Sequence, residues 1–273
     1  MSDSVSARGY AKINLFLRIV GAKGDYHEIE TLLQSVDLYD EITLSKTDND
    51  TVTSSFPGDN SILVLETLKD AFHLGGMTLS VKKNIPLGGG LGGSSADAAA
   101  AAVACAKLWD LPLEIVKKTV ASLYGDLAFQ MTAGTAIARG MGEEIDSLPP
   151  LPDYAVLLAF PKEGVSTEEA YRLSDTLPKG RGSALSLYWA LTRGDDANRY
   201  YLNDLLPPAI LLNDEISPFL ERMRDDKALL TGMTGSGSTL FSLYKRREDA
   251  IKKSNELPFS TLVTETISPF LAK

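Results

Sequence analysis

The chain opens with an alternating pattern that predicts a β-strand. Between Lys12 and Leu17, lysine, asparagine and phenylalanine alternate with isoleucine and two leucines, which is the period of two typical of a half-buried strand. Further strands are predicted at residues 27–36, 41–46, 77–82, 135–139, 154–160 and 239–244. The first two of these would flank a bend at Asp37–Asp40, and Gly24-Asp25 predicts an earlier turn.

Helical spacing appears between these strands. Apolar residues from Ile62 to Phe72 recur at intervals of three and four, which predicts a helix that starts at Ser61 and ends before Gly75-Gly76. An alanine-rich helix is predicted from about residue 95 to 109, and others at 113–123, 168–172, 184–191 and 214–225.

A cluster of prolines at positions 149, 150 and 152 is the strongest boundary signal in the chain. It predicts two domains, residues 1–150 and 151–273. Strands and helices are mixed in both halves, so the predicted fold class is α+β.

Composition narrows the class of protein. Twenty-seven Lys+Arg against thirty-six Asp+Glu give a net charge of −9, which argues against a broad nucleic-acid or anionic-membrane surface. The longest purely apolar run, Ala98–Ala106, is far shorter than the ~20 residues of a membrane helix. The single cysteine, Cys105, cannot form an internal disulfide, and no Cys/His spacing indicates a metal site. We expect a cytoplasmic protein, monomeric or weakly dimeric, without nucleic-acid or membrane partners.

The strongest chemical signal is the glycine-rich segment Pro86–Asp97. Five of the six residues from 88 to 93 are glycine, immediately before the predicted alanine-rich helix. Glycine permits positive φ and close backbone approach, so successive N–H groups can converge on an anion at the positive end of the helix. Ser94 and Ser95 could donate to phosphate oxygens or coordinate a phosphate-bound cation. The alternative is a flexible turn with a serine cap.

This segment resembles the phosphate loop of the GHMP kinases, which include galactokinase, homoserine kinase and mevalonate kinase. Two further segments, Ala11–Leu15 and Gly232–Thr239, resemble other motifs of that superfamily in the same order. Within the superfamily, the 4-diphosphocytidyl-2-C-methyl-D-erythritol kinase family matches best, on five segments: Ala11–Leu17, Tyr26-His27, Gly134–Glu143, Val165–Thr167 and Asn203–Leu205.

The resemblance implies a fold and an activity. The fold would be an N-terminal domain like ribosomal protein S5 domain 2 and a ferredoxin-like C-terminal domain. The activity would be ATP-dependent phosphorylation of the 2-hydroxyl of a small molecule that carries a cytidine diphosphate. Mg²⁺ would be carried mainly by the nucleotide, and no protein metal ligands are predicted.

Site residues follow from the same resemblance. Asp126 matches the catalytic aspartate, although it could instead cap the segment 127–131, and Lys12 would lie beside it, although an isolated strand lysine is more often solvated. The implied nucleotide-binding residues are Pro86, Gly88, Gly89, Gly90, Leu91, Gly92, Gly93, Ser94, Ser95, Lys83 and Asn60. The implied substrate-binding residues are Asn14, Tyr26, His27, Thr167 and Tyr171. Solvated side chains are the alternative for Lys83 and Asn60, and helix packing is the alternative for Tyr171.

The chain departs from the family pattern in three places. Gly24-Asp25 precedes Tyr26-His27 where the family has Asp-Gly, the serine pair Ser94-Ser95 lies one position early, and Tyr124–Ala128 lacks a proline. Two other functions remain open: a GHMP kinase for another alcohol, such as mevalonate or homoserine, and a catalytically silent binding protein. Tyr26-His27 and Val165–Thr167 weigh against the first, because kinases for those alcohols have no cytosine to bind. The presence of both Lys12 and Asp126 weighs against the second.

Overall fold

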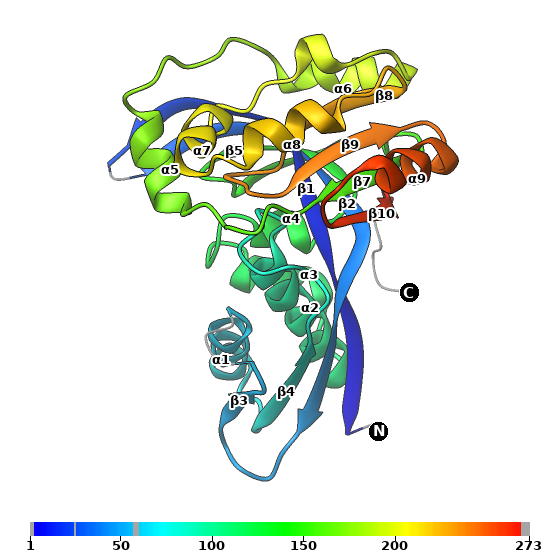
Figure 1. The fold of residues 1–273 in the computed structure, drawn as a ribbon. Helices are drawn as coiled ribbons and strands as arrows, with labels where there is room; N and C mark the ends of the chain where they lie inside the picture. Colours follow the sequence, from blue (N-terminus) through cyan, green and yellow to red (C-terminus); the bar gives the residue numbers. More distant parts are fainter. Residues whose placement is uncertain (1–2, 25, 57–59, 269–273) are drawn as a thin grey trace.

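The computed structural model describes residues 3–24, 26–56 and 60–268, and its longest feature is a twisted antiparallel ribbon of two strands (Figure 1). β1 (Ser4–Lys23) pairs with β2 (Tyr26–Lys46) along nearly its whole length. Irregularities in the register at three points along β1 bend the ribbon. Asp25, part of the predicted turn between the strands, lies outside the described residues.

The predicted break between two strands at Asp37–Asp40 is wrong, because β2 continues through these residues. The pairing is nevertheless irregular here, since β2 has three residues between Tyr39 and Ser35 where β1 has one between Tyr10 and Lys12. Asp40 is fully buried, and its Oδ1 accepts hydrogen bonds from the backbone N–H groups of Asn84 and Ile85. An aspartate at this position would often favour a turn. Here its carboxylate has partners on a neighbouring segment and ties β2 to it.

The first sheet has the strand order β3 (Val52–Ser54), β4 (Met77–Lys82), β2, β5 (Thr135–Gly140) and β6 (Glu144–Ser147), with β1 also paired to β2. Four helices accompany it: α1 (Ser61–Phe72), α2 (Gly93–Leu108), α3 (Leu113–Val120) and α4 (Leu127–Gln130). The alanine-rich α2 packs against β1, β2 and α1. Its small side chains are buried nearly all round, so backbone can approach it closely on several sides.

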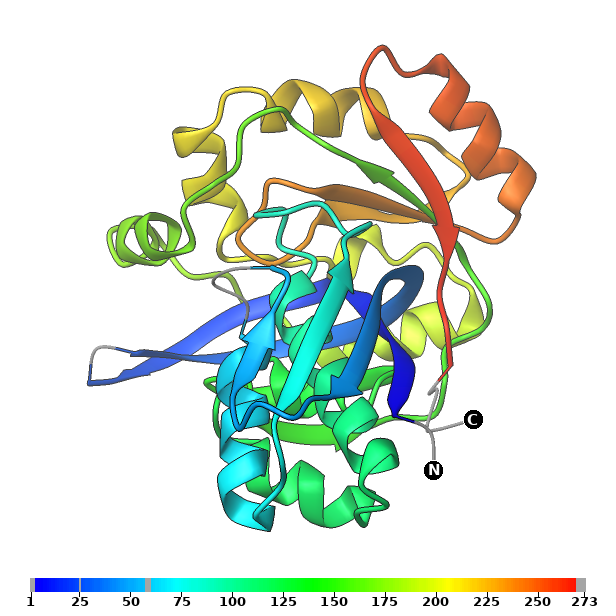
Figure 2. The same ribbon diagram turned by 90° about the horizontal axis from the view of Figure 1, so that it is seen from below.

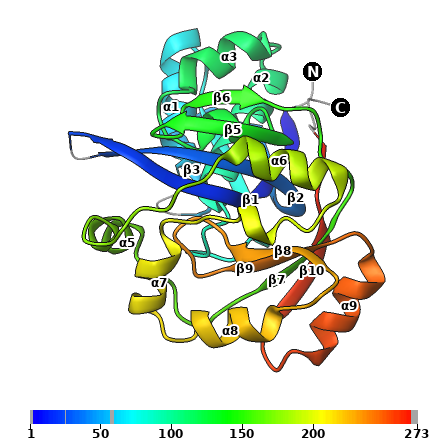
Figure 3. The ribbon, with the colours of Figure 1, turned by 90° about the horizontal axis from the view of Figure 1, so that it is seen from above.

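The second sheet has the order β10 (Thr261–Glu265), β7 (Ala155–Ala159), β9 (Leu240–Tyr244) and β8 (Ala228–Met233), and every pair is antiparallel. Figure 3 shows α7 (Leu206–Leu212), α8 (Ile216–Met223) and α9 (Arg247–Glu256) along one face of this sheet. On the other face, α6 (Ala184–Arg193) lies towards the first sheet. The chain is completed by α5 (Thr167–Ser174) and a short 3₁₀ turn at Asn198–Tyr200. The α+β class is confirmed.

The two sheets share one hydrophobic core. A single buried cluster contains Leu15 and Leu32 of the ribbon, Leu187 of α6 and Leu243 of β9. The end of β10 returns to the ribbon, as Figure 2 shows from below, and Ile267 N–H donates to the carbonyl oxygen of Ser35. The division at residue 150 stays a prediction, and it falls between the strands of the first sheet and those of the second.

Among the described residues, no helix combines the length and apolar character that crossing a membrane requires. Cys105 is buried within α2, and burial raises the pKa of its thiol to about 12. The thiol therefore stays protonated near neutral pH, which makes it a poor nucleophile.

Candidate active site

The glycine-rich segment forms a hollow at the start of α2. Residues Pro86–Ser95 line a space of about 190 Å³. Gly88, Gly90 and Gly92 have φ of +67°, +74° and +70°, a region that other residues adopt only with strain. The hollow combines open backbone with the free N–H groups of a helix N-terminus, an arrangement suited to a polyphosphate.

The third glycine motif holds this loop in place. Thr234 Oγ1 donates to the carbonyl oxygen of Gly90 at 3.1 Å, and it accepts from the backbone N–H of Asn14 at 3.0 Å. Thr239 N–H donates to the carbonyl oxygen of Gly89 at 3.3 Å. Three segments that are far apart in the sequence therefore meet at one point.

Lys12 lies at this meeting point. Its side chain is buried, and its Nζ donates to Asn14 Oδ1 at 2.7 Å and to the carbonyl oxygen of Gly90 at 3.1 Å. The same Nζ lies 3.5 Å from Asp126 Oδ2. The solvated alternative for Lys12 is therefore wrong.

Asp126 faces the ammonium group and remains open to solvent. It occupies the N-cap position of α4, but its side chain makes no capping hydrogen bond. Its side chain is 37% exposed, compared with 6% for Lys12. Burial raises the pKa of Tyr171 to about 12, and the negative charge of Asp126 contributes to this rise, so the phenol lies near the carboxylate. The Asp126 carboxylate is therefore accessible to a ligand, whereas the carboxylate of a capping residue would be occupied by a backbone N–H group.

Lys83 lies on the other side of the loop and is closely paired. Its Nζ lies 2.5 Å from Asp40 Oδ2 and 2.6 Å from Asp97 Oδ2, and a Cβ placed on Gly93 would be 3.5 Å from it. The Lys83 side chain is 15% exposed, and both carboxylates are buried. The solvated alternative for Lys83 is therefore wrong. The ammonium fixes the segment before the loop to β2 and α2.

Asp97 is a buried carboxyl group whose pKa is raised well above the usual range. Burial raises its pKa to about 8, the Asp40 carboxylate adds to the rise, and the Lys83 ammonium opposes it. Its Oδ1 is buried without a hydrogen-bond partner in the described part of the chain. Burial and the Asp40 carboxylate therefore favour the protonated form of this carboxyl.

The substrate-side aromatic residues lie where β2 begins and along α5. The rings of His27 and Tyr171 stack with centroids 4.9 Å apart and an interplanar angle of 28°. Tyr26 is 67% exposed, so its ring is the open one of the three. Among them, Tyr26 offers the freest face to a planar ligand.

The remaining predicted residues have varied positions. Asn14 Nδ2 donates to Thr31 and its Oδ1 accepts from Lys12, so this side chain orients the lysine. Thr167 Oγ1 lies 2.8 Å from Ser236 Oγ. Asn60 is the N-cap of α1, and its side chain makes no capping hydrogen bond. Which of them contact a ligand stays a prediction.

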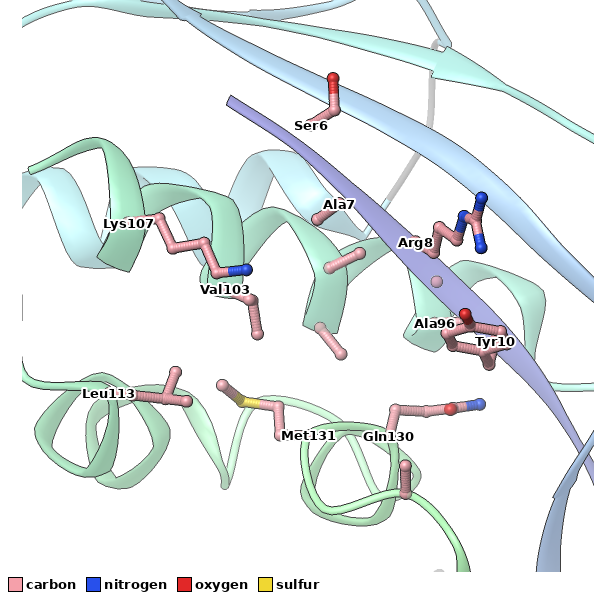
Figure 4. Close-up of a pocket in the computed structure, with 14 residues that line it drawn as sticks. Ser6, Ala7, Arg8, Tyr10, Ala96, Val103, Lys107, Leu113, Gln130 and Met131 are labelled. Atoms are coloured by element: carbon pink, nitrogen blue, oxygen red, sulfur yellow. The ribbon is translucent and has the colours of Figure 1, made fainter. Parts of the chain in front are cut away.

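A second and larger hollow lies between β1, α2 and the residues around the end of α4 (Figure 4). It measures about 360 Å³ and is lined mostly by small and apolar side chains, with two cations, Arg8 and Lys107. Gln130 also lines it, and its Nε2 lies 3.4 Å from the carbonyl oxygen of Gly92. Lys12 and Asp126 do not line this larger space, whereas Lys12 donates to the carbonyl oxygen of Gly90, which lines the smaller hollow. The smaller hollow is therefore the candidate active site.

Several residues around the site were not predicted from the sequence: Asp40, Asp97, Gln130, Asp175, Thr234 and Ser236. The motif Gly232–Thr239 was recognised, but its hydroxyl groups were given no contacts. Asp175 carries a signal in its spacing, because it follows Tyr171 by four residues and so shares its helix face. The sequence contains no such signal for Asp40, because its partners lie 43 to 57 residues away in the chain.

Comparison with known proteins agrees with this geometry. The family model described as GHMP kinases N terminal domain matches residues 60–137, and the one described as GHMP kinases C terminal matches residues 187–260. The 4-diphosphocytidyl-2-C-methyl-D-erythritol kinase of Desulfitobacterium hafniense is 36% identical over 264 residues, covering 92% of this chain and 90% of its own. The enzyme of the same name from Rhizobium etli is 35% identical, covering 97% and 95%.

Solved structures give the same result. A crystal structure of 4-(cytidine 5'-diphospho)-2C-methyl-D-erythritol kinase superposes with a TM-score of 0.83 at 28% identity, covering 96% of this chain and 99% of that one. A homoserine kinase from Cytophaga hutchinsonii has a TM-score of 0.73 at 20% identity, which shows a shared fold alone. The expected two-part fold is confirmed. The chain belongs to the GHMP kinases, in the family whose named members are 4-diphosphocytidyl-2-C-methyl-D-erythritol kinases.

Proposed function

We propose that this protein is an ATP-dependent kinase that phosphorylates the 2-hydroxyl of 4-diphosphocytidyl-2-C-methyl-D-erythritol. The observation that carries the proposal is the pairing of buried Lys12 with half-exposed Asp126 at 3.5 Å, directly beside Gly90 of the phosphate loop. Relatives that cover more than nine-tenths of the chain bear the name of this activity. A protein that only binds a ligand would need neither an exposed carboxylate nor a lysine held against it.

The nucleotide would place its phosphates in the hollow of Pro86–Ser95. Backbone N–H groups and the positive end of α2 would offset the phosphate charge. The hydroxyls of Ser94 and Ser95 are candidate ligands for Mg²⁺ that would arrive on the nucleotide and be held mainly by it, and the ion would supply charge neutralisation at the phosphates. Pro86–Ser95 supplies no carboxylate, so this donor set suits an ion that arrives on phosphate.

Phosphoryl transfer to an alcohol depends on positioning and on charge stabilisation. Asp126 would accept the proton of the attacking hydroxyl as the new P–O bond forms. Lys12, held by Asn14 and the carbonyl of Gly90, would orient the Asp126 carboxylate and offset charge on the transferring group. The phenol of Tyr171 would remain protonated beside Asp126.

The cytosine ring would lie near the start of β2. Tyr26 supplies an exposed ring for stacking, and His27 supplies polar nitrogens for the base edge. The net charge of −9 supports a protein that acts without nucleic acid or membranes. We expect it to work in the cytoplasm as a monomer or a weak homodimer.

The test is release of ADP in a coupled assay. The purified protein is given ATP and Mg²⁺ with the cytidine substrate, and in parallel with mevalonate and with homoserine. We expect turnover with the cytidine substrate and at least a hundredfold lower kcat/KM with the other two. Equal or greater activity on mevalonate or homoserine would assign another substrate. Binding of ATP without turnover on any of the three would indicate a silent binding protein.

A further inference from the structure

Helix α5 presents two residues to the same histidine. Tyr171 lies within α5, and Asp175 directly follows the last residue of the helix in a helical backbone conformation. The two are four positions apart and therefore share one face. Tyr171 stacks on the His27 ring at 4.9 Å, and Asp175 Oδ1 lies 2.7 Å from His27 Nε2.

The two contacts fix different properties of the imidazole. Stacking on Tyr171 restrains the plane of the ring, and the hydrogen bond to Asp175 restrains its rotation within that plane. An ionised carboxylate is only an acceptor, so His27 Nε2 must carry the hydrogen. In the neutral imidazole, Nδ1 is then the acceptor.

We propose that Asp175 is a positioning residue for nucleobase choice, which holds His27 with Nε2 as the donor and Nδ1 as the acceptor. This inference rests on the proposed function, because it concerns the base carried by the substrate. Cytosine has an amino group at position 4, which donates to an acceptor. Uracil has a carbonyl there, and its lone pairs would oppose those of Nδ1. Asp175 thus selects cytosine without touching it.

The exposure of Asp175 limits the size of the effect. Its side chain is 56% exposed and that of His27 is 18% exposed, so water competes for the carboxylate. Charged groups near this face include Asp175 itself, Asp126 near Tyr171, and Lys179, whose Nζ donates to the carbonyl oxygen and the hydroxyl of Ser174. We therefore expect a shift of about tenfold in the ratio of kcat/KM for the cytidine substrate to that for its uridine counterpart.

The first experiment measures the hydrogen bond without using catalysis. The chain has two histidines, His27 and His73, so an imidazole ¹⁵N–¹H spectrum at alkaline pH contains two spin systems, with His73 as internal reference. We expect a protonated, exchange-protected Nε2 on His27 in the wild type and loss of that protection in Asp175→Ala. A wild-type His27 with an unprotonated Nε2, or protection that survives Asp175→Ala, would overturn the positioning role.

The second experiment measures base choice. The variants are Asp175→Ala, Asp175→Asn, whose amide can also donate to Nε2, and Glu168→Gln as a matched carboxylate change on the same helix. We expect both Asp175 variants to lower the cytidine-to-uridine ratio about tenfold through KM of the nucleoside substrate, with KM for ATP unchanged and Glu168→Gln at the wild-type ratio. An unchanged ratio in an active Asp175→Ala would overturn the specificity role. A wild type inactive on both substrates would instead count against the proposed function, and the spectrum would still decide the position of His27.

Discussion

Two lysines flank the phosphate loop, and each faces carboxylates in a different way. Lys83 lies 2.5 Å and 2.6 Å from two buried carboxylates, those of Asp40 and Asp97. Lys12 lies 3.5 Å from one carboxylate, that of Asp126, which is 37% exposed. The carboxyl groups around Lys83 are enclosed within the protein, whereas the looser Lys12–Asp126 pair leaves a carboxylate available to a ligand. The looser pair is therefore suited to chemistry, and the tighter group to holding the loop.

The energies of the two arrangements differ for the same reason. A buried charge that loses its partner keeps its full desolvation cost, so breaking a buried pair is strongly destabilising. A partly exposed pair contributes little to stability, because water and salt screen it. Substitutions at the two lysine sites should therefore separate activity from stability.

The largest expected effect is on turnover in Asp126→Asn. Asparagine keeps the shape of the side chain but cannot accept the hydroxyl proton, so we expect kcat to fall by ~10²–10⁴-fold. The free energy of unfolding should change by less than ~0.5 kcal/mol, since the side chain is partly exposed and makes no cap. Steady-state kinetics and urea unfolding check both, with Asp70→Asn on the exposed face of α1 as the control. Near wild-type turnover would contradict the role of a base.

The second effect is on stability, in Lys83→Met. Removing the ammonium leaves the buried Asp40 carboxylate without its cation and the Asp97 carboxyl without its hydrogen-bond donor, and we expect a loss of ~3–5 kcal/mol in the free energy of unfolding. The matched control is the neighbouring Lys82→Met, because Lys82 pairs with Glu41 at 3.1 Å with both side chains at least half exposed. In Lys82→Met, the loss in the free energy of unfolding should stay below ~1 kcal/mol. Equal losses in the two variants would show that the Lys83 group is no stronger than a surface pair.

The third effect is the pH dependence of stability that Asp97 causes. Its pKa is about 8 in the folded protein and about 3.9 in the unfolded chain. Between these values the native state holds a proton that the unfolded state has lost, so stability declines as pH rises through this range and the contribution is gone above about pH 8. One proton corresponds to a slope of at most ~1.4 kcal/mol per pH unit.

Asp97→Asn, which cannot ionise, tests this directly. We expect it to remove the downward slope, so that its stability relative to the wild type rises by about 1–2 kcal/mol between pH 6.5 and pH 8. Urea unfolding at both pH values measures the difference. Parallel pH profiles for the two proteins would show that Lys83 keeps Asp97 ionised throughout.

The loop was predicted from a local pattern, and the pair Lys12 and Asp126 from the family resemblance. The carboxylates that pair with Lys83 were not predicted, because neither source of information connects them. Pro86–Asp97 is a local pattern in which glycine content and the following helix indicate backbone geometry directly. The partners of Lys83 lie on β2 and α2, and no local pattern connects Asp40 to them. The same limit produced the wrong strand break at Asp37–Asp40, because an aspartate in isolation favours a turn.

Three of the elements that were not predicted, α9, β8 and β6, have their own physical reasons. Helix α9 buries only Ala250, so its sequence lacks the apolar period that indicates a helix. Strand β8 is nearly all buried, and a short apolar run without alternation does not indicate a strand by itself. Strand β6 is four residues long and mostly exposed. In each case tertiary contacts, rather than local preference, decide the structure.

The smallest expected effects come from substitutions at two glycines of the phosphate loop, which the two lysines flank. Gly88 and Gly90 both have positive φ, so alanine at either costs about 1–2 kcal/mol of backbone strain. At Gly88 an added Cβ meets nothing within 4 Å, whereas at Gly90 it would lie 2.5 Å from the carbonyl oxygen of Thr234. Gly90→Ala must therefore displace the carbonyl that accepts from Lys12.

We expect Gly88→Ala to lose only that strain energy and to keep kcat within about threefold of the wild type, since no contact of the Lys12–Asp126 pair is disturbed. Gly90→Ala should lower kcat and raise KM for ATP together, because the loop and the lysine shift as one. Comparing kcat, KM for ATP and urea unfolding for both variants separates strain from position. Equal kinetic losses in the two would mean that backbone freedom of the loop, rather than its contact with Lys12, limits the reaction.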